Sequence, residues 1–354
     1  MEKSKVYYIK EINAENLIKI YEALGVNLKG KIGVKVSTGE DGAKGYLKAD
    51  LIGPLVKKLN GTIIECNTAY PGARNNAEDH MKVAEKHGFT SFADVDIMDA
   101  TGEFKIPVKK GKHLKYDIVG NNFKNYDSII NLAHGKGHAM GGFGGAMKQL
   151  SIGFASRAGK ANIHSGGFTL DYNETWSHKA EQSDFTAAMA DAASTIVKYF
   201  RSKKGIVFIN VLANISTLCD CGNKAPEPRV RDIGILASTD PVAIDKACYD
   251  LILKENTNGS NAWKDWANER LALHTLEVAE KLNVGTQDYN LIEVEFDDLW
   301  YVYYIIIPIG GLLIIGLIIT LIVIKVRKGK KEKLLSENQD ENAELGSAVI
   351  SRAE

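Results

Sequence analysis

Patterns typical of strands and of helices alternate along most of the chain, and this alternation constrains the fold more than any other feature. Apolar residues recur at helical spacing in some segments and form short runs or alternate in others. Helices are expected at 13–24, 50–59, 77–87, 184–201, 241–253 and 263–282, and strands at 31–37, 62–67, 94–98, 128–133, 206–212, 233–237 and 289–296.

Alternation of this kind predicts crossover units, in which helices connect parallel strands. We therefore expect an α/β domain over residues 1–298, with a mostly parallel sheet or sheets flanked by helices. A domain of this length could divide into two lobes, at about 1–180 and 181–298. No internal repeat is evident.

The composition is that of an ordinary globular protein. Lysine plus arginine and aspartate plus glutamate both number 44 among 354 residues, so the charge gives no indication of a nucleic-acid partner. The four cysteines are too few and too scattered for a disulfide framework, which favours a reducing compartment. The sequence leaves the oligomeric state open.

The end of the chain differs from the rest. Residues 299–324 are 26 positions without a charge, enough for a helix to cross a bilayer, and aromatic residues gather at the start of this segment. We predict a transmembrane helix at 299–324, followed by a basic and then polar, disordered tail at 325–354.

The orientation in the membrane is open. The basic residues after the segment place the C-terminus in the cytoplasm by the positive-inside rule, and this orientation would export the large domain. The cysteines and the absence of a signal-peptide pattern at the N-terminus favour a cytoplasmic domain anchored by its C-terminal helix. We favour the cytoplasmic domain.

A glycine-rich segment, 134–164, follows the strand expected at 128–133 and is the clearest candidate site. Eight glycines lie between Gly135 and Gly159, interleaved with basic side chains. Glycines let the backbone approach a ligand, cationic groups suit anions, and imidazoles suit metals or proton transfer. A basic surface loop with tight turns is the alternative. The candidates for catalysis and for binding a ligand or cofactor are His138, Lys148, His164, Arg157, Gly141, Gly142, Gly144 and Gly145.

A second candidate site is the sequence Cys219-Asp220-Cys221 in a loop that contains two prolines. Two thiols at this spacing could supply part of a soft-metal site. They provide two ligands at most, and a loop with two free thiols is the equal alternative.

Loops that follow the first two expected strands could complete a site. Arg74 and Lys35 lie near such strand ends, where ligands gather in open sheets, and are expected to contact anions. Asp240 is expected to cap a helix, and Asp245 to be an exposed or cap-adjacent charge. Five further histidines are expected on the surface: His80, His87, His113, His178 and His274.

Several blocks of sequence together resemble the domain-of-unknown-function family 362, often labelled uncharacterised Fe-S centre proteins. The blocks are KIGVKVSTGE, TIIECNTAY, NLAHGKGHAMGGFGGAMKQLSIG, NVLANIS with CDC, and DIGILASTDPVAIDKA. Many relatives carry an inserted ferredoxin-type module with two four-cysteine clusters. Four cysteines in this chain cannot hold that module, so no ferredoxin-type cluster is expected.

The order His138, Lys148, His164 around glycines is also similar, more remotely, to nickel-pincer lactate racemases. That resemblance implies that Lys148 matches the lysine that carries the cofactor, His164 a nickel ligand and His138 an acid/base residue. A second catalytic histidine motif and a phosphate-binding element of that family have no counterpart here.

These observations lead to three hypotheses. The first is an enzyme that uses a metal or cofactor, with iron, nickel or zinc as the candidate metals, for proton or hydride transfer on a small molecule at His138, Lys148 and His164. The second is an iron-sulfur or other metal-carrying redox protein that uses Cys219 and Cys221. The third is a non-catalytic module that binds a phosphorylated small molecule through Lys148, Arg157 and loop amides.

Overall fold

The computed structural model describes residues 3–203, 205–219, 227–294, 321–326 and 328. Met1–Val294 form one compact unit, and Glu295–Glu354 form a second. The first unit contains every named helix and strand.

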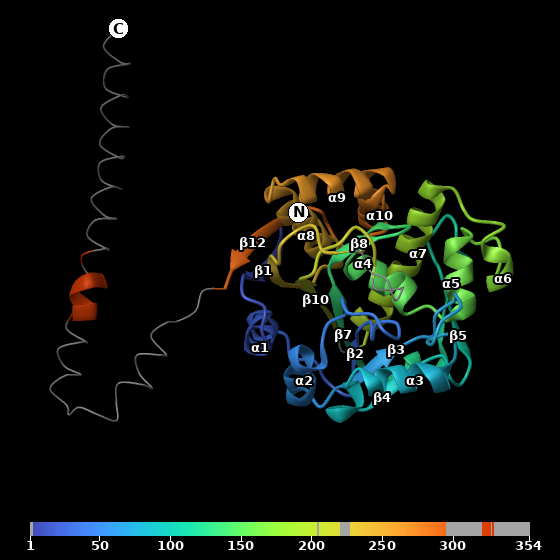
Figure 1. Ribbon diagram of the computed structural model, residues 1–354, viewed down its shortest axis with the longest axis horizontal. Helices are drawn as coiled ribbons and strands as arrows, with labels where there is room; N and C mark the ends of the chain where they lie inside the picture. The colour runs from blue at the N-terminus through green and yellow to red at the C-terminus, as the bar shows by residue number, and fades with distance from the viewer. Residues whose placement is uncertain (1–2, 204, 220–226, 295–320, 327, 329–354) are drawn as a thin grey trace, which may run out of the picture. The chain divides into compact units, whose positions relative to one another are not determined.

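An eight-stranded sheet forms the centre of the first unit, in the order β12-β1-β11-β10-β7-β2-β3-β4 (Figure 1). Its strands are parallel except that β11 is antiparallel to both β1 and β10, so the sheet is mostly parallel as predicted. The strands are β1 (Ser4–Ile9), β2 (Ile32–Lys35), β3 (Thr62–Glu65), β4 (Val95–Ile97), β7 (Ser128–His134), β10 (Ile206–Leu212), β11 (Gly234–Ser238) and β12 (Tyr289–Glu293).

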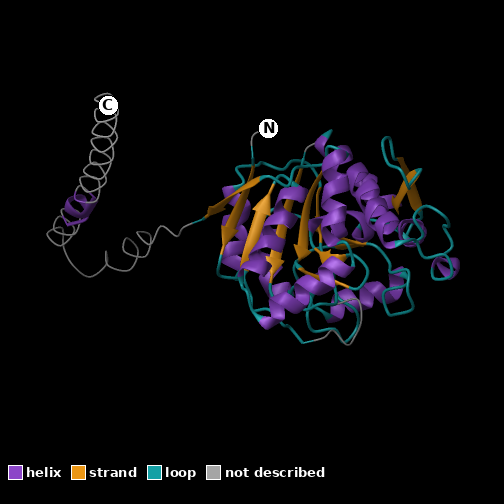
Figure 2. Ribbon diagram, turned by 90° about the horizontal axis from the view of Figure 1, so that it is seen from above, coloured by secondary structure: helices purple, strands orange, loops and turns teal. Residues whose placement is uncertain are grey.

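Helices cover both faces of this sheet (Figure 2). One face packs against α1 (Ala14–Ala23), α2 (Ala49–Lys58) and α3 (Ala77–Lys86). The other packs against α4 (Ala146–Lys148), α7 (Gln182–Arg201) and α8 (Pro241–Lys254). The remaining elements are β5 (Glu103–Pro107), β6 (Tyr116–Gly120), β8 (Lys136–His138), β9 (Gly142–Gly144), α5 (Arg157–His164), α6 (Tyr172–Thr175), α9 (Asn258–Glu269), α10 (Ala272–Lys281), a π-helix (Gln149–Gly153) and two 3-10 helices (Phe89–Ser91, Asn121–Asn125).

Neighbouring residues on the central strands belong to opposite cores because side chains alternate along a strand. Ile129 and Phe208 lie in the core under α7 and α8, whereas Ile130 and Ile209 lie in the core under α1 and α2. All of β7 and β10 is buried. Burial on both faces explains why these strands are continuous apolar runs in the sequence.

Two features of the fold differ from the prediction. Strand β1 was not expected, although it pairs with both β11 and β12 and so joins the two ends of the domain. The single helix expected at 263–282 is instead two helices, α9 and α10, separated at Leu271. Leu271 has a left-handed backbone with φ of 50°, and a helix cannot continue through that conformation.

The sheet takes strands from both sides of residue 180, and Met1–Val294 form a single compact unit. Most of the predicted transmembrane segment, 299–320, lies outside the described residues, as does nearly all of the tail. Within the part that is described, there is no helix of sufficient length and apolar character to span a bilayer.

Candidate functional site

A cavity of about 190 Å³ lies at the carboxyl ends of the parallel strands. Ser37 follows β2, Thr68 follows β3, and both line the cavity. A smaller cavity of about 40 Å³ shares Ser37 and is also lined by Ala133 and His134 at the end of β7. The strand order reverses between β2 and β7, because β3 and β4 extend the sheet from β2 while β10 extends it from β7. Open α/β sheets bind ligands at such a reversal.

The short helix α4 carries Lys148 and is fixed by two residues outside it. The buried Asp245 of α8 accepts hydrogen bonds from the backbone N–H groups of Ala146 (2.7 Å) and Met147 (2.9 Å). Gln149 donates to the carbonyl oxygens of Lys35 and Leu132, both at 2.8 Å. The helix is therefore held at its N-terminus by α8 and at its C-terminus by the ends of β2 and β7.

Lys148 lines both cavities. Within the described residues, its amine has no hydrogen bond or ion pair. Burial, with the nearby cations Lys136, Lys35 and Lys160, lowers the pKa of Lys148 to about 7. A large fraction of the Lys148 amine is therefore neutral at physiological pH.

His138 is buried at the end of β8 and lines both cavities. Its Nδ1 accepts hydrogen bonds from the backbone N–H groups of Gly141 (2.8 Å) and Met140 (3.3 Å). Burial and the nearby Lys148 keep the pKa of His138 well below its usual value, so the ring is neutral. Because Nδ1 is an acceptor, the proton of the neutral ring lies on Nε2, which is left as a hydrogen-bond donor.

His164 presents the opposite tautomer. Its Nδ1 donates to the carbonyl oxygen of Lys160, one turn earlier in α5, at 2.7 Å. Burial lowers the pKa of His164 to about 4, although this hydrogen bond opposes the shift. The ring is neutral, and its Nε2 carries a lone pair that can accept a proton or bind a metal.

Two further cations line the larger cavity, Arg74 and Lys160, and both are buried. Lys160 donates to the carbonyl oxygen of Ala155 at 2.5 Å. The guanidinium of Arg74 forms ion pairs with Glu40 (3.5 Å) and Glu65 (3.4 Å) and donates to the hydroxyl of Tyr70 (3.0 Å). This wall of the cavity contains two cationic side chains that could bind an anion, although the charge of Arg74 is partly balanced by Glu40 and Glu65.

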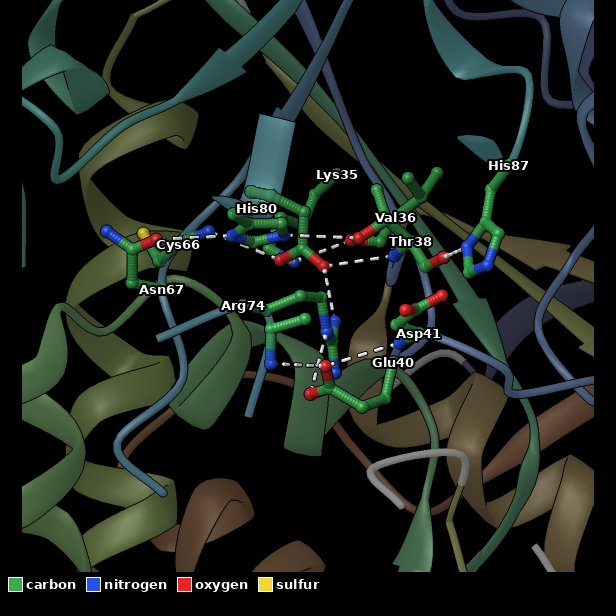
Figure 3. A network of polar contacts seen from close by, with 12 residues as sticks. Lys35, Val36, Thr38, Glu40, Asp41, Cys66, Asn67, Arg74, His80 and His87 are labelled. Atoms are coloured by element: carbon green, nitrogen blue, oxygen red, sulfur yellow. Dashed lines mark hydrogen bonds and ion pairs between the residues drawn. The ribbon is translucent and has the colours of Figure 1, made fainter. Parts of the chain in front are cut away.

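The network behind Arg74 is centred on Glu65, at the end of β3. Figure 3 shows Lys35, Arg74 and His80 converging from three separate segments. The carboxylate of Glu65 accepts from Lys35 Nζ (2.8 Å) and from the backbone N–H of Thr38 (3.0 Å), besides its contact with Arg74. Burial alone would raise the pKa of Glu65, but Lys35, His80 and Arg74 outweigh it and lower the pKa to about 2.

The family model described as Domain of unknown function (DUF362) matches residues 32–250, which run from β2 to α8 and include the whole site. The chain belongs to this family. The resemblance found in the sequence blocks is thereby confirmed.

Solved structures similar to this DUF362 protein are distant. A protein from Thermotoga maritima is 15% identical with a TM-score of 0.36, and the match covers 58% of this chain and 52% of that one. The lactate racemase apoprotein from Thermoanaerobacterium thermosaccharolyticum is 13% identical with a TM-score of 0.41, covering 70% of this chain and 57% of that one. The chain thus spans little more than half the length of these two proteins. No curated protein matches the sequence.

The structure brings together most of the residues singled out in this DUF362 sequence. His138, Lys148, His164, Arg74 and Cys219 all line the larger cavity. Lys35 differs from the expectation of a direct anion contact, because its amine is buried against Glu65.

The glycines of the site make close contacts with the protein itself. A Cβ atom on Gly145 would lie 2.4 Å from the Asp245 carboxylate, and one on Gly142 would lie 2.8 Å from the carbonyl oxygen of Ala267. Gly142 also has a positive φ of 72°. Gly141 lies beside His138, whereas Gly144 and Gly145 line the smaller cavity. Glycine at 142 and 145 thus allows other parts of the chain to pack closely against the backbone. From the sequence alone, this reason for a glycine looks the same as close approach of a ligand.

Arg157 and the two cysteines were also singled out. Arg157 is not among the residues that line the larger cavity, and its guanidinium lies over the ring of Tyr172, 5.1 Å from the centroid. Cys219 is disulfide-bonded. Cys221 lies outside the described residues. Among the described residues, no group of three or more histidine, cysteine, aspartate or glutamate side chains could hold a metal ion.

Two residues of the site have a different environment from the one expected. Asp240 caps α8 as predicted, but Asp245 is fully buried and caps α4 instead of lying exposed. His80 is fully buried, not on the surface, and contacts the side chains of Thr38 (3.1 Å) and Asn67 (3.3 Å). Asp245 lies in a helix between apolar residues, and this pattern could have indicated that its carboxylate is buried. Glu65 is likewise a carboxylate at the end of a buried strand, and this pattern could have indicated a buried polar network at that strand end.

Proposed function

We propose that this DUF362 protein is an enzyme that binds a small anionic molecule in the larger cavity and transfers a proton or hydride to or from it. The observation that supports this proposal is the complementary protonation of three side chains that line one cavity. His138 has an N–H donor, His164 has a lone pair, and Lys148 has a largely neutral amine.

Each side chain has a separate role in the proposed reaction. Arg74 and Lys160 hold the anionic group, since both are buried cations in the cavity wall. His138 Nε2–H donates a hydrogen bond to a ligand oxygen on which negative charge develops. A neutral imidazole can make this hydrogen bond and keep its proton. Nε2 of His164 and the amine of Lys148 are the proton acceptors.

A metal or organic cofactor is a further part of the proposal. The described residues offer a metal one imidazole lone pair, on His164, in cationic surroundings, so a metal ion held by protein side chains alone does not fit. A metal that brings most of its ligands in an anionic organic group does fit, with His164 as one ligand and Arg74 and Lys160 binding the anion. When bound, such a group would supply the hydride acceptor.

The test is a reaction screen on the protein as purified, with lactate and pyruvate as the first probes of 2-hydroxy and 2-oxo acids. Nuclear magnetic resonance in D₂O reports proton exchange beside the carboxylate, and optical rotation reports inversion. We expect turnover of at least one acid by the native protein and a loss of about 100-fold or more in His164→Gln. Anion binding without turnover, unchanged by His164→Gln, would contradict the enzymatic proposal.

The outcome with binding but no turnover would instead support the third hypothesis, a binding module for a phosphorylated small molecule. Arg74, Lys148 and Lys160 favour it because three cationic or basic groups line the cavity. The cysteine-based redox hypothesis has no additional support, since Cys219 is disulfide-bonded and the described residues contain no group of three or more possible metal ligands.

The membrane anchor also remains a proposal. It rests on the 26 uncharged residues at 299–324. We propose a single C-terminal helix that anchors a cytoplasmic domain. Extraction of cell membranes with carbonate tests the anchor, and protease protection of the domain tests its side of the membrane.

A further inference from the structure

The amine of Lys148 differs from the other buried amines around the cavity. Lys35 pairs with Glu65, and Lys160 donates to the carbonyl oxygen of Ala155. Lys136 contacts Nδ1 of His134 at 2.7 Å. Within the described residues, Lys148 alone among these four amines has no hydrogen bond or ion pair, and it lines both cavities.

This arrangement favours nucleophilic chemistry at the Lys148 nitrogen. A lysine next to other cations and out of water loses its proton, and a neutral amine attacks carbonyl carbon. Lys35, Lys136 and Lys160 provide the neighbouring cations. Each is fixed by its own contact. The Glu65 carboxylate opposes the effect of these cations on Lys148, but burial and the three cations outweigh it.

We propose that Lys148 forms an imine with a small anionic carbonyl compound, such as a 2-oxo acid or an aldehyde acid, bound in the larger cavity. This inference rests on the proposed function above and specifies its ligand class. The Lys148 nitrogen bonds to the carbonyl carbon, the C=O π bond breaks, and the nitrogen proton moves to the oxygen. The oxygen takes up the second nitrogen proton and leaves as water, and a C=N bond replaces C=O. No oxidant or reductant is needed.

The walls of the cavity match the two ends of such a ligand. Arg74 and Lys160 would bind the ligand carboxylate. Their positive charges would offset the tendency of that carboxylate to raise the pKa of the Lys148 amine. His138 Nε2–H would donate to the oxygen of the tetrahedral intermediate. Tyr70, Tyr172 and Trp176 line the same cavity and provide an apolar wall for the carbon skeleton.

The experiment traps the imine in the full-length protein. Glyoxylate, a small anionic aldehyde, is added with cyanoborohydride, and the adduct is located by intact mass and peptide mapping. We expect one reduced adduct, on Lys148, formed with glyoxylate in preference to the neutral acetaldehyde. Lys148→Arg keeps a positive charge but not the nucleophile, so it should reduce labelling to background.

A control lysine distinguishes site reactivity from general reactivity. Lys198 lies on the exposed surface of α7, outside the residues that line the cavity, and partial loss of hydration together with nearby Lys110 also lowers its pKa. Lys198→Arg should leave the labelling of Lys148 unchanged. Labelling spread evenly over surface lysines, or equal labelling in Lys148→Arg, would overturn the inference.

Calorimetry with oxalate, an anion that cannot form an imine, separates this inference from the proposed function. Oxalate binding that is lost in Arg74→Met, together with no adduct on Lys148, would overturn the imine and leave the anion-binding site intact. Absence of both oxalate binding and adduct would overturn both. A native protein whose Lys148 already carries a covalent group would also overturn the imine proposal.

Discussion

At the scale of single residues, the site depends on charges that the fold keeps in unusual protonation states. Lys148 has a pKa of about 7, and Glu65 has a pKa of about 2. The first value reflects burial among cations, and the second reflects the charges of Lys35, His80 and Arg74, which outweigh burial. Because both pKa values are lowered, each group makes stability rise with pH, Glu65 between about pH 2 and 4.5 and Lys148 between about pH 7 and 10.5. The charged form of Glu65 stabilises the fold, whereas the charged form of Lys148 destabilises it.

Lys148→Met should increase the free energy of unfolding at pH 6 by about 2 kcal/mol. The unfolded chain holds the Lys148 proton up to pH about 10.5, whereas the folded chain loses it near pH 7. Lys148 therefore lowers the free energy of unfolding. This destabilisation is complete below pH 7 and disappears as the pH approaches 10.5. Urea unfolding of both proteins between pH 6 and 10 measures this difference.

Lys82→Met is the control with opposite sign. Hydrogen bonds and ion pairs with Glu78 and Asp79 raise the pKa of Lys82. Its contribution is stabilising at neutral pH and is lost as the pH rises through its raised pKa, so the variant should be slightly less stable at pH 6. An equal effect of both substitutions would contradict the environment assigned to Lys148.

Glu65→Gln should lower the free energy of unfolding at pH 7 by about 3–5 kcal/mol, because it leaves Lys35 buried without a carboxylate and Arg74 with Glu40 alone. The lowered pKa means that the carboxylate stabilises the fold fully above pH 4.5 and loses this effect as the pH falls toward 2. The difference between variant and parent should shrink over that range. Glu78→Gln removes an exposed pair with Lys82 and should change stability by less than about 1 kcal/mol.

At the scale of elements, the position of α4 requires glycine at residue 145, whereas residue 144 has room for a side chain. Gly145→Ala would place a Cβ 2.4 Å from the Asp245 carboxylate that caps α4, whereas a Cβ on Gly144 would find its nearest atom at 3.5 Å. We expect Gly145→Ala to destabilise the protein by about 1–3 kcal/mol and to reduce glyoxylate labelling of Lys148.

Gly144→Ala is the matched control and should change stability by less than about 1 kcal/mol. Thermal unfolding and the labelling assay measure both variants. Equal stability of the two variants would show that the hydrogen bonds of Asp245 to α4 do not depend on close packing against Gly145.

Elements also show where sequence patterns were sufficient. The helix expected at 77–87 and the strand expected at 206–212 correspond closely to α3 (Ala77–Lys86) and β10 (Ile206–Leu212), since each has a strong period or a continuous apolar run. The break between α9 and α10 was missed because Leu271 has no turn-type side chain. Strand β1 was missed because its pairing with β11 and β12 involves residues more than 200 positions away.

At the scale of the whole molecule, Met1–Val294 should fold without the residues that follow. A chain that ends at Val294 keeps β12, whose residues pair with β1 and whose neighbour Val294 donates to the carbonyl oxygen of Tyr8 at 2.8 Å. We expect it to have the same urea midpoint as the full chain. A chain that ends at Asp288 loses β12 and exposes an edge of β1, which should cost about 2 kcal/mol or more.

These two truncations differ by only six residues, so a comparison isolates the edge strand. Loss of stability in both would show that residues after Val294 contribute to the fold. No loss in either would show that β12 does not stabilise the sheet.

The sequence by itself determined the class of fold, the family and the segment that carries the site. Alternating periods predict layers of helix and sheet, and the glycines and basic residues after a buried strand indicate His138, Lys148 and His164. Local patterns suffice for these features because each is a property of neighbouring residues.

Only the tertiary structure decided what the site residues can do. The tautomers of His138 and His164 follow from specific backbone contacts, and the pKa of Lys148 follows from cations brought in from other elements. Asp245 reaches α4 from 99 positions away, and Glu65 meets Lys35 from 30 positions away. Such contacts depend on distances in space that arise when the sheet assembles, so no local pattern in the chain encodes them.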